Sequence, residues 1–262
     1  MSLQRHDITA AGAHFAVFRL AAAPPRDGAE LIWAHGWGHS HDALAPLAMA
    51  MRSRADSWLV DLPGFGASPP PPGAWGTEDY ADAMAAWIAT LPAGPRVWIG
   101  HSFGCRVGVQ LAARHPDAVQ ALFLCAAAGL PPHRSPMTRL QRLPRRLAFR
   151  ALRAVTPEGP ARDRLRERFG SSDYRKAGAM RPVLVKAVSE DLSEAARRIR
   201  VPVVLVHGDR DSESPREIAE RFHALIPGAQ LHVLRGFDHW NILGDGRHQV
   251  THLLGALLES LR

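Results

Sequence analysis

The chain has 262 residues, of which 46% are apolar and 22% are charged. This is the balance of a globular protein, and it excludes a disordered or collagen-like chain. The formal net charge is +7, from 32 Lys+Arg against 25 Asp+Glu, and the 2 Cys are too few for a disulfide framework.

Cys105 and Cys125 both lie among apolar residues, so we expect two buried free thiols. The length fits one α/β domain with an insertion better than two equal domains. Residues 1–7 contain no apolar run of the kind that a signal peptide needs. No segment approaches about 18 consecutive apolar residues, the length of a membrane span. We therefore expect a cytoplasmic protein without a membrane span.

Short β-like runs alternate with helical patterns, which predicts a mostly parallel sheet of about eight strands with helices on both faces. Residues 15–18 are expected to form an antiparallel edge strand. Six further apolar runs are typical of parallel strands buried on both faces: 31–34, 58–60, 97–99, 121–124, 203–206 and 231–234. Helices are expected from a cap at Thr77 towards Leu91, from Ser214-Pro215 onward, and over 250–261.

Between Gly129 and Arg200 the strand pattern stops and Arg-rich helical patterning begins, which indicates an insertion. Residues 131–190 hold 15 Lys+Arg and 5 Asp+Glu, a local balance of +10, so the other 202 residues have a balance of −3. Apolar residues recur at helical spacing at 140, 143, 147 and 151, as on a helix face that packs against the rest of a protein. The charge is also that of a solvated basic face. No aromatic-basic interleaving accompanies it, so we expect no nucleic-acid partner.

The segment Gly100-His101-Ser102-Phe103-Gly104 fits the pattern G-x-S-x-G. A predicted strand ends at the motif and a predicted helix over 105–113 follows it. On such a turn the serine has strained backbone angles and an exposed Oγ, while the two glycines let strand and helix approach each other. We expect a nucleophile elbow here; the alternative is an ordinary glycine-rich turn.

A serine hydroxyl needs a base, and the base needs an orienting carboxylate. His239 follows the last predicted strand and Asp211 follows the strand before it, in the Ser, Asp, His order that accompanies G-x-S-x-G. Asp209 is the competing acid. We favour Asp211 because a residue three positions past Gly208 can fold over towards His239. Other C-terminal histidines fit less well, because they lie in a predicted strand or beside the last helix: His232, His248 and His252.

The segment His35-Gly36-Trp37-Gly38 directly follows the 31–34 strand. We expect the backbone N–H groups of Trp37 and Phe103 to form the oxyanion hole. His35, His39 and His41 are also spaced as metal ligands could be, but no carboxylate at ligand spacing completes a site. We therefore expect neither a metal nor a cofactor.

Together these segments resemble the α/β-hydrolase superfamily, as does the segment over 61–68, which reads DLPGFGAS. The Trp37 loop and residues 61–68 look like those of small carboxylesterases such as the pimeloyl carrier-protein methyl ester esterases. The resemblance implies an α/β-hydrolase core over 1–130 and 191–262. It also implies a helical cap over 131–190, inserted after the sixth strand.

Within that superfamily, dehalogenases and epoxide hydrolases have Asp at the elbow, where this chain has Ser102. The resemblance therefore implies a carboxylic ester hydrolase in which Ser102 attacks the carbonyl, His239 moves the proton and Asp211 orients His239. A C–C bond hydrolase, a thioesterase and a lactonase share this triad, and a non-catalytic ligand-sensing protein is a further alternative. The basic cap suggests a carrier-linked or anionic acyl substrate attracted by charge. The oligomeric state cannot be inferred from these patterns.

Overall fold

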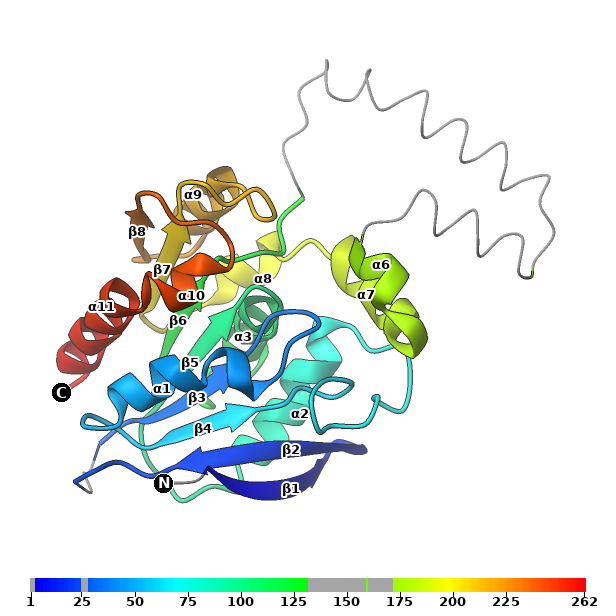
Figure 1. Ribbon diagram of the computed structural model, residues 1–262, viewed down its shortest axis with the longest axis horizontal. Helices are drawn as coiled ribbons and strands as arrows, with labels where there is room; N and C mark the ends of the chain where they lie inside the picture. Colours follow the sequence, from blue (N-terminus) through cyan, green and yellow to red (C-terminus); the bar gives the residue numbers. More distant parts are fainter. Residues whose placement is uncertain (1–2, 25–27, 132–158, 160–171) are drawn as a thin grey trace, which may run out of the picture.

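One eight-stranded sheet organises the chain, of which the computed structural model describes residues 3–24, 28–131, 159 and 172–262 (Figure 1). The strand order is β1-β2-β4-β3-β5-β6-β7-β8. β1 (Gln4–Ala10), β2 (Ala13–Leu20) and β4 (Ser57–Val60) are antiparallel neighbours. The remaining pairings are parallel: β3 (Glu30–Ala34), β5 (Arg96–His101), β6 (Ala121–Cys125), β7 (Val203–Gly208) and β8 (Gln230–Leu234). The predicted mostly parallel sheet is confirmed.

Helices cover both faces of this sheet (Figure 1). One face packs against α1 (Ala45–Met51), α10 (Asn241–Gly244) and α11 (Arg247–Ser260), with a 3₁₀ turn, η1 (His41–Ala43), before α1. The other packs against α2 (Thr77–Ile88), α3 (Phe103–Arg114), α8 (Ser193–Arg198) and α9 (Arg216–Leu225). Alternate residues of β3 serve the two cores, with Trp33 on one side and Ile32 on the other. Strands buried on both faces account for the uniformly apolar runs in the sequence.

A third group of helices lies between β6 and β7 in the chain: α6 (Ser172–Lys176), η2 (Gly178–Met180) and α7 (Arg181–Ser189). They belong to the segment 131–190, of which residues 132–158 and 160–171, with the apolar positions 140–151, lie outside the described residues. Side-chain hydrogen bonds connect α7 to the core. Arg106 Nη1 donates to the backbone oxygen of Ala187 at 2.7 Å, and Lys186 Nζ donates to Asp79 Oδ2 at 3.1 Å.

The start of α2 differs from the prediction in one respect. Thr77 is the first residue of the helix, and the capping residue is Gly76, whose N–H donates to Asp79 Oδ2 at 2.7 Å. Thr77 instead donates from its N–H and its Oγ1 to the Glu190 carboxylate, which directly follows α7. This contact spans 113 residues, so no local pattern could predict it.

Two further differences concern short elements. Pro215 precedes α9 as its capping residue, and the helix begins at Arg216. β1 was not predicted, because six of its seven residues are polar or alanine and none of the seven is fully buried. It pairs only with β2, so it lies at the edge of the sheet, where an apolar pattern is not required.

Cys105 and Cys125 are buried free thiols, as expected. Cys105 Sγ donates to the backbone oxygens of Gly100 at 3.1 Å and Cys125 at 3.2 Å. Burial raises the pKa of both thiols, that of Cys125 to about 12. They therefore stay protonated and act as small apolar residues beneath the elbow. Among the described helices, none has the length and apolar character needed to cross a bilayer.

Candidate active site

Ser102 occupies a sharp turn between β5 and α3, with φ +49° and ψ −101°. A positive φ is strained for a residue with a side chain, and the surrounding contacts must enforce it. The Ser102 N–H donates to the backbone oxygen of Cys125 at 3.1 Å. A Cβ at Gly100 would lie 2.6 Å from the Cys105 nitrogen, and one at Gly104 would lie 2.0 Å from the Ala34 oxygen. Both glycines of the motif are therefore sterically required.

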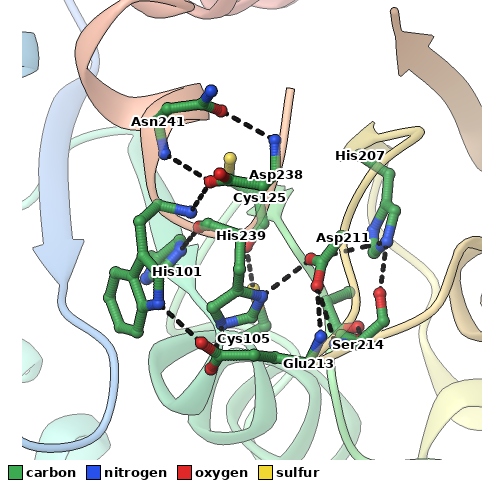
Figure 2. Close-up of polar contacts among 12 residues, drawn as sticks. His101, Cys105, Cys125, His207, Asp211, Glu213, Ser214, Asp238, His239 and Asn241 are labelled. Carbon is green, nitrogen blue, oxygen red and sulfur yellow. Dashed lines mark hydrogen bonds and ion pairs between the residues drawn. The ribbon is translucent and has the colours of Figure 1, made fainter. Parts of the chain in front are cut away.

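His239 and Asp211 meet at the carboxyl ends of β7 and β8, where His239 Nδ1 lies 2.7 Å from Asp211 Oδ2 (Figure 2). Both side chains are buried. A carboxylate only accepts hydrogen bonds, so Nδ1 carries the proton and Nε2 has the free lone pair. Asp209 has a different role, because its Oδ1 accepts the Gly236 N–H at 2.7 Å. The structure thus brings Asp211, and not Asp209, to His239.

The Asp211 carboxylate is stabilised in its ionised form. Its Oδ1 accepts the N–H groups of Glu213 at 2.9 Å and Ser214 at 2.8 Å. Burial alone would raise the pKa of Asp211, but hydrogen bonds from His239 and Ser214 outweigh it and hold that pKa below its ordinary value. The group is therefore negatively charged at neutral pH, as the orienting acid of a histidine must be.

Two buried histidines anchor the loops that carry these residues (Figure 2). His101 Nε2 lies 2.9 Å from the backbone oxygen of His239, and His207 Nε2 lies 2.6 Å from that of Ser214. A carbonyl oxygen only accepts, so each Nε2 is the donor. Burial lowers the pKa of both rings, that of His101 to about 3, and both are neutral at neutral pH.

The loop after β3 passes directly over the elbow. A Cβ at Gly36 would lie 2.8 Å from His101 Nδ1 and 3.4 Å from Ser102 Cβ. His35 fixes this loop, since its Nδ1 donates to the Gly36 oxygen at 2.7 Å and its Nε2 accepts the Leu62 N–H at 3.1 Å. Burial lowers the pKa of His35 to about 4. The ring is therefore a neutral hydrogen-bonding group at neutral pH.

The backbone N–H groups expected to bind an oxyanion belong to two residues whose side chains are in contact. The Trp37 and Phe103 rings pack edge to face with their centroids 5.3 Å apart. In the part of the chain that the structure describes, neither residue's N–H donates a hydrogen bond. Both N–H groups are therefore available as donors, as those of an oxyanion hole must be.

The three histidines of the same loop do not converge. His35 is bound as described above, His41 Nδ1 lies 2.9 Å from Asp61 Oδ1, and the His39 ring packs on Trp240 at 4.4 Å between centroids. Within the described ranges, no group of three or more His, Cys, Asp and Glu side chains is arranged to hold a metal ion.

A pocket of about 910 Å³ lies beside His239. Its lining is part aromatic and part charged, and it combines the loop after β3 with α6 and η2: Trp37, Gly38, His39, Gly64, Phe65, Gly66, Asp173, Lys176, Ala177, Met180, Glu213 and Trp240. Ser102 and His239 are not themselves among the lining residues. Two lining residues do contact His239: the Glu213 carboxylate faces its Nε2, and the Trp240 ring packs against its imidazole. The pocket can therefore hold a substrate next to the reacting groups.

One site residue carries no sequence signal. Glu213 Oε2 lies 3.8 Å from His239 Nε2, and Glu213 Oε1 accepts the Trp240 indole N–H at 2.7 Å. Its position depends on the turn that follows Asp211 and on the loop around His239, which are far apart in the chain.

Ser102 Oγ makes no hydrogen bond with any described residue.

A family model described as alpha/beta hydrolase fold matches residues 31–170. The chain belongs to this family of hydrolases.

Curated relatives cover most of the chain. A pimeloyl-[acyl-carrier protein] methyl ester esterase of Chromobacterium violaceum is 31% identical over 232 residues, which are 81% of this chain and 87% of that protein. A 2-(acetamidomethylene)succinate hydrolase of Mesorhizobium japonicum is 28% identical over 233 residues, 81% of this chain and 82% of that protein. Among solved structures, an enol-lactonase from Burkholderia xenovorans superposes with a TM-score of 0.72 at 19% identity, over 96% of this chain and 99% of that one. The last likeness concerns the fold alone.

Proposed function

We propose that this protein is a serine hydrolase that cleaves a carboxylic ester with a small or medium acyl group. The observation that carries the proposal is the 2.7 Å contact between His239 Nδ1 and Asp211 Oδ2, at the same end of the sheet as a strained Ser102. The esterase among the curated relatives supports the same reaction class.

In the proposed mechanism, Ser102 Oγ attacks the ester carbonyl while His239 Nε2 takes the hydroxyl proton. The developing oxyanion accepts hydrogen bonds from the N–H groups of Trp37 and Phe103. His239 then protonates the leaving alcohol, and an acyl-enzyme on Ser102 remains. A water molecule, deprotonated by His239, hydrolyses this intermediate, and Asp211 stabilises the imidazolium in both steps. The ester reaction needs no metal or cofactor.

We further propose that residues 131–190 form a cap over this site. The proposal is supported by four pocket residues from the described part of that segment, Asp173, Lys176, Ala177 and Met180. The local charge balance of +10 suits an acyl group that is anionic at its far end or linked to an acidic carrier. If so, kcat/KM for a carrier-linked ester should fall with salt more steeply than that for a neutral ester, and parallel curves would contradict the idea.

The test of the reaction is hydrolysis of p-nitrophenyl esters from acetate to decanoate by the wild type and by Ser102→Ala. Loss of the nucleophile should lower kcat by about 10³-fold or more. Ser193→Ala, which removes a hydroxyl that bonds only to Asp191 at the start of α8, is the matched control and should keep wild-type rates. Equal rates for the wild type and Ser102→Ala would refute the assignment.

Neighbouring reactions use the same three residues, and the relatives include a 2-(acetamidomethylene)succinate hydrolase. A panel of matched ester, thioester, lactone and C–C substrates identifies the bond that is cleaved. Stoichiometric labelling of Ser102 by a fluorophosphonate probe, without turnover of any substrate, would instead favour the non-catalytic ligand-sensing alternative.

A further inference from the structure

Glu213 presents a second carboxylate to His239, on the side opposite Asp211 (Figure 2). Its Oε2 lies 3.8 Å from Nε2, the nitrogen that delivers a proton to the leaving alcohol in the mechanism proposed above. The Glu213 side chain is 52% exposed and lines the pocket. The carboxylate therefore faces the space that the alcohol part of a substrate must enter.

Two contacts hold this carboxylate in position. The Glu213 N–H donates to Asp211 Oδ1 at 2.9 Å, which ties its backbone to the orienting acid. Its Oε1 accepts the indole N–H of Trp240, the residue after His239, at 2.7 Å. Oε2 is left facing His239 and the pocket. The charge is thus fixed relative to the base and is not free to swing away.

The other charged groups of the pocket do not neutralise Glu213. Asp173 adds a second carboxylate and Lys176 one ammonium group. Burial lowers the pKa of His39, so that ring is neutral at pH 7. The described charged groups that line the pocket therefore have a formal balance of −1, from Glu213 and Asp173 against Lys176.

We propose that Glu213 selects the alcohol part of the substrate by charge. A positively charged group near the leaving oxygen is favoured over an uncharged isostere, and a carboxylate there is disfavoured. The inference rests on the proposed ester hydrolysis and deepens it, because it concerns the leaving group only. A charge at the far end of the acyl chain is a separate matter, governed by the basic cap.

Three acetate esters isolate this effect: choline acetate, its uncharged isostere 3,3-dimethylbutyl acetate, and 3-acetoxypropanoate. All three form the same acetyl-enzyme, so differences in kcat/KM arise before the alcohol leaves. For unit charges about 5 Å apart in a half-exposed site, we expect choline acetate to exceed its isostere by about fivefold to tenfold. The carboxylate ester should fall below the isostere by a similar factor.

Glu213→Gln removes the charge and keeps an oxygen that can accept the Trp240 N–H, so the ratio of choline acetate to its isostere should fall to about one. Glu259→Gln makes the same charge change on α11, outside the pocket, and should retain the wild-type ratio. An unchanged ratio in Glu213→Gln, or a wild type that prefers 3-acetoxypropanoate, would overturn the inference.

Two further measurements keep the test decisive. If Glu213→Gln does not fold, raising NaCl from about 20 to 500 mM should reduce the wild-type ratio towards one, because salt screens a half-exposed charge; a constant ratio overturns the inference. If no acetate is turned over, choline should protect Ser102 from a fluorophosphonate probe better than 3,3-dimethylbutanol does, and equal protection overturns it. If Ser102→Ala keeps full activity, the proposed function itself is wrong. If Ser102→Ala is inactive but Glu213→Gln keeps the wild-type ratio of choline acetate to its isostere, only the role of Glu213 is wrong.

Discussion

His101 donates a hydrogen bond from Nε2 to the backbone oxygen of His239, at 2.9 Å and across 138 positions of the chain. The two rings lie 5.0 Å apart between centroids. His101 adjoins Ser102, so this bond ties the turn of the candidate nucleophile to the loop of the candidate base. The variable position of the G-x-S-x-G motif therefore helps to set the distance between the two groups.

The neutral state of buried histidines predicts a loss of stability in acid. Burial lowers the pKa of His101 from 6.5 to about 3 and that of His35 to about 4. Between these values and 6.5 the unfolded chain binds protons that the folded chain excludes, so the free energy of unfolding falls as pH falls below 6.5. At pH 5 each ring should account for about 2 kcal/mol of the loss. Urea unfolding at pH 7.5, 6 and 5 measures it.

The contribution of His101 can be separated with His101→Gln. Glutamine can still donate to the His239 oxygen but does not titrate, so the variant should lose about 2 kcal/mol less than the wild type between pH 7.5 and pH 5. The quantity compared is the change in the free energy of unfolding between pH 7.5 and pH 5, so a general loss of stability in the variant does not affect it. The same change in both proteins would contradict a neutral buried His101.

The acid of the candidate triad can be tested without changing shape. In Asp211→Asn the group facing His239 Nδ1 is neutral, and the imidazolium loses its counter-charge and its preferred tautomer. We expect kcat for the best p-nitrophenyl ester to fall by about 10²- to 10⁴-fold, with a much smaller change in KM. Steady-state kinetics near pH 8 give both values.

Asp209→Asn is the matched control for this variant. Asp209 lies two residues away and accepts the Gly236 N–H, with no contact to His239. Its rate should stay within about threefold of the wild type, because only a loop hydrogen bond is weakened. If Asp209→Asn were the more damaging change, the acid would have to be reassigned.

Close packing at the elbow predicts which glycine tolerates a side chain. In Gly104→Ala the new Cβ would lie 2.0 Å from the Ala34 oxygen, a backbone atom that cannot move without disturbing β3. We expect a loss of about 3 kcal/mol or more, or failure to fold. Gly94→Ala is the control, since nothing lies within 4 Å of its Cβ. Thermal unfolding of the two variants should differ clearly, and equal melting temperatures would refute the steric argument.

Much of the fold is predictable because its parallel strands are buried on both faces. The runs that became β3, β4, β5, β6 and β7 are apolar for that reason, whereas β8 lies at the sheet edge, where Leu231 and Leu234 are partly buried against the two cores. Each of these six strands was expected within three residues of its observed ends. β1 escaped prediction because it lies at the sheet edge and has no apolar run, with Ile8 as its one large apolar residue. Local periodicity reports burial, and an exposed edge strand has little of it.

In the candidate site, too, some residues are predictable from the sequence and others are not. Ser102, Asp211 and His239 each lie in a loop that follows a predicted strand, and they occur in the order Ser, Asp, His that accompanies G-x-S-x-G. Glu213 could not be predicted, because its contact with His239 depends on two loops that meet only in the folded chain. Motifs indicate which residues react, whereas groups that tune the reaction are set by tertiary contacts.

The contact between Thr77 and Glu190 predicts how firmly α7 is held against α2. Thr77 is buried and donates both its N–H and its Oγ1 to one carboxylate, so Glu190 has two partners from the first turn of α2. Thr77→Val keeps the shape and the N–H but removes the hydroxyl donor. Leaving part of the carboxylate unsatisfied should lower the free energy of unfolding by about 1 to 2 kcal/mol. Thr251→Val, in which a hydroxyl on the exposed face of α11 is removed, should change it by less than about 0.5 kcal/mol. Urea unfolding of both variants decides the point, and equal stabilities would mean that the hydroxyl contributes nothing to holding α7.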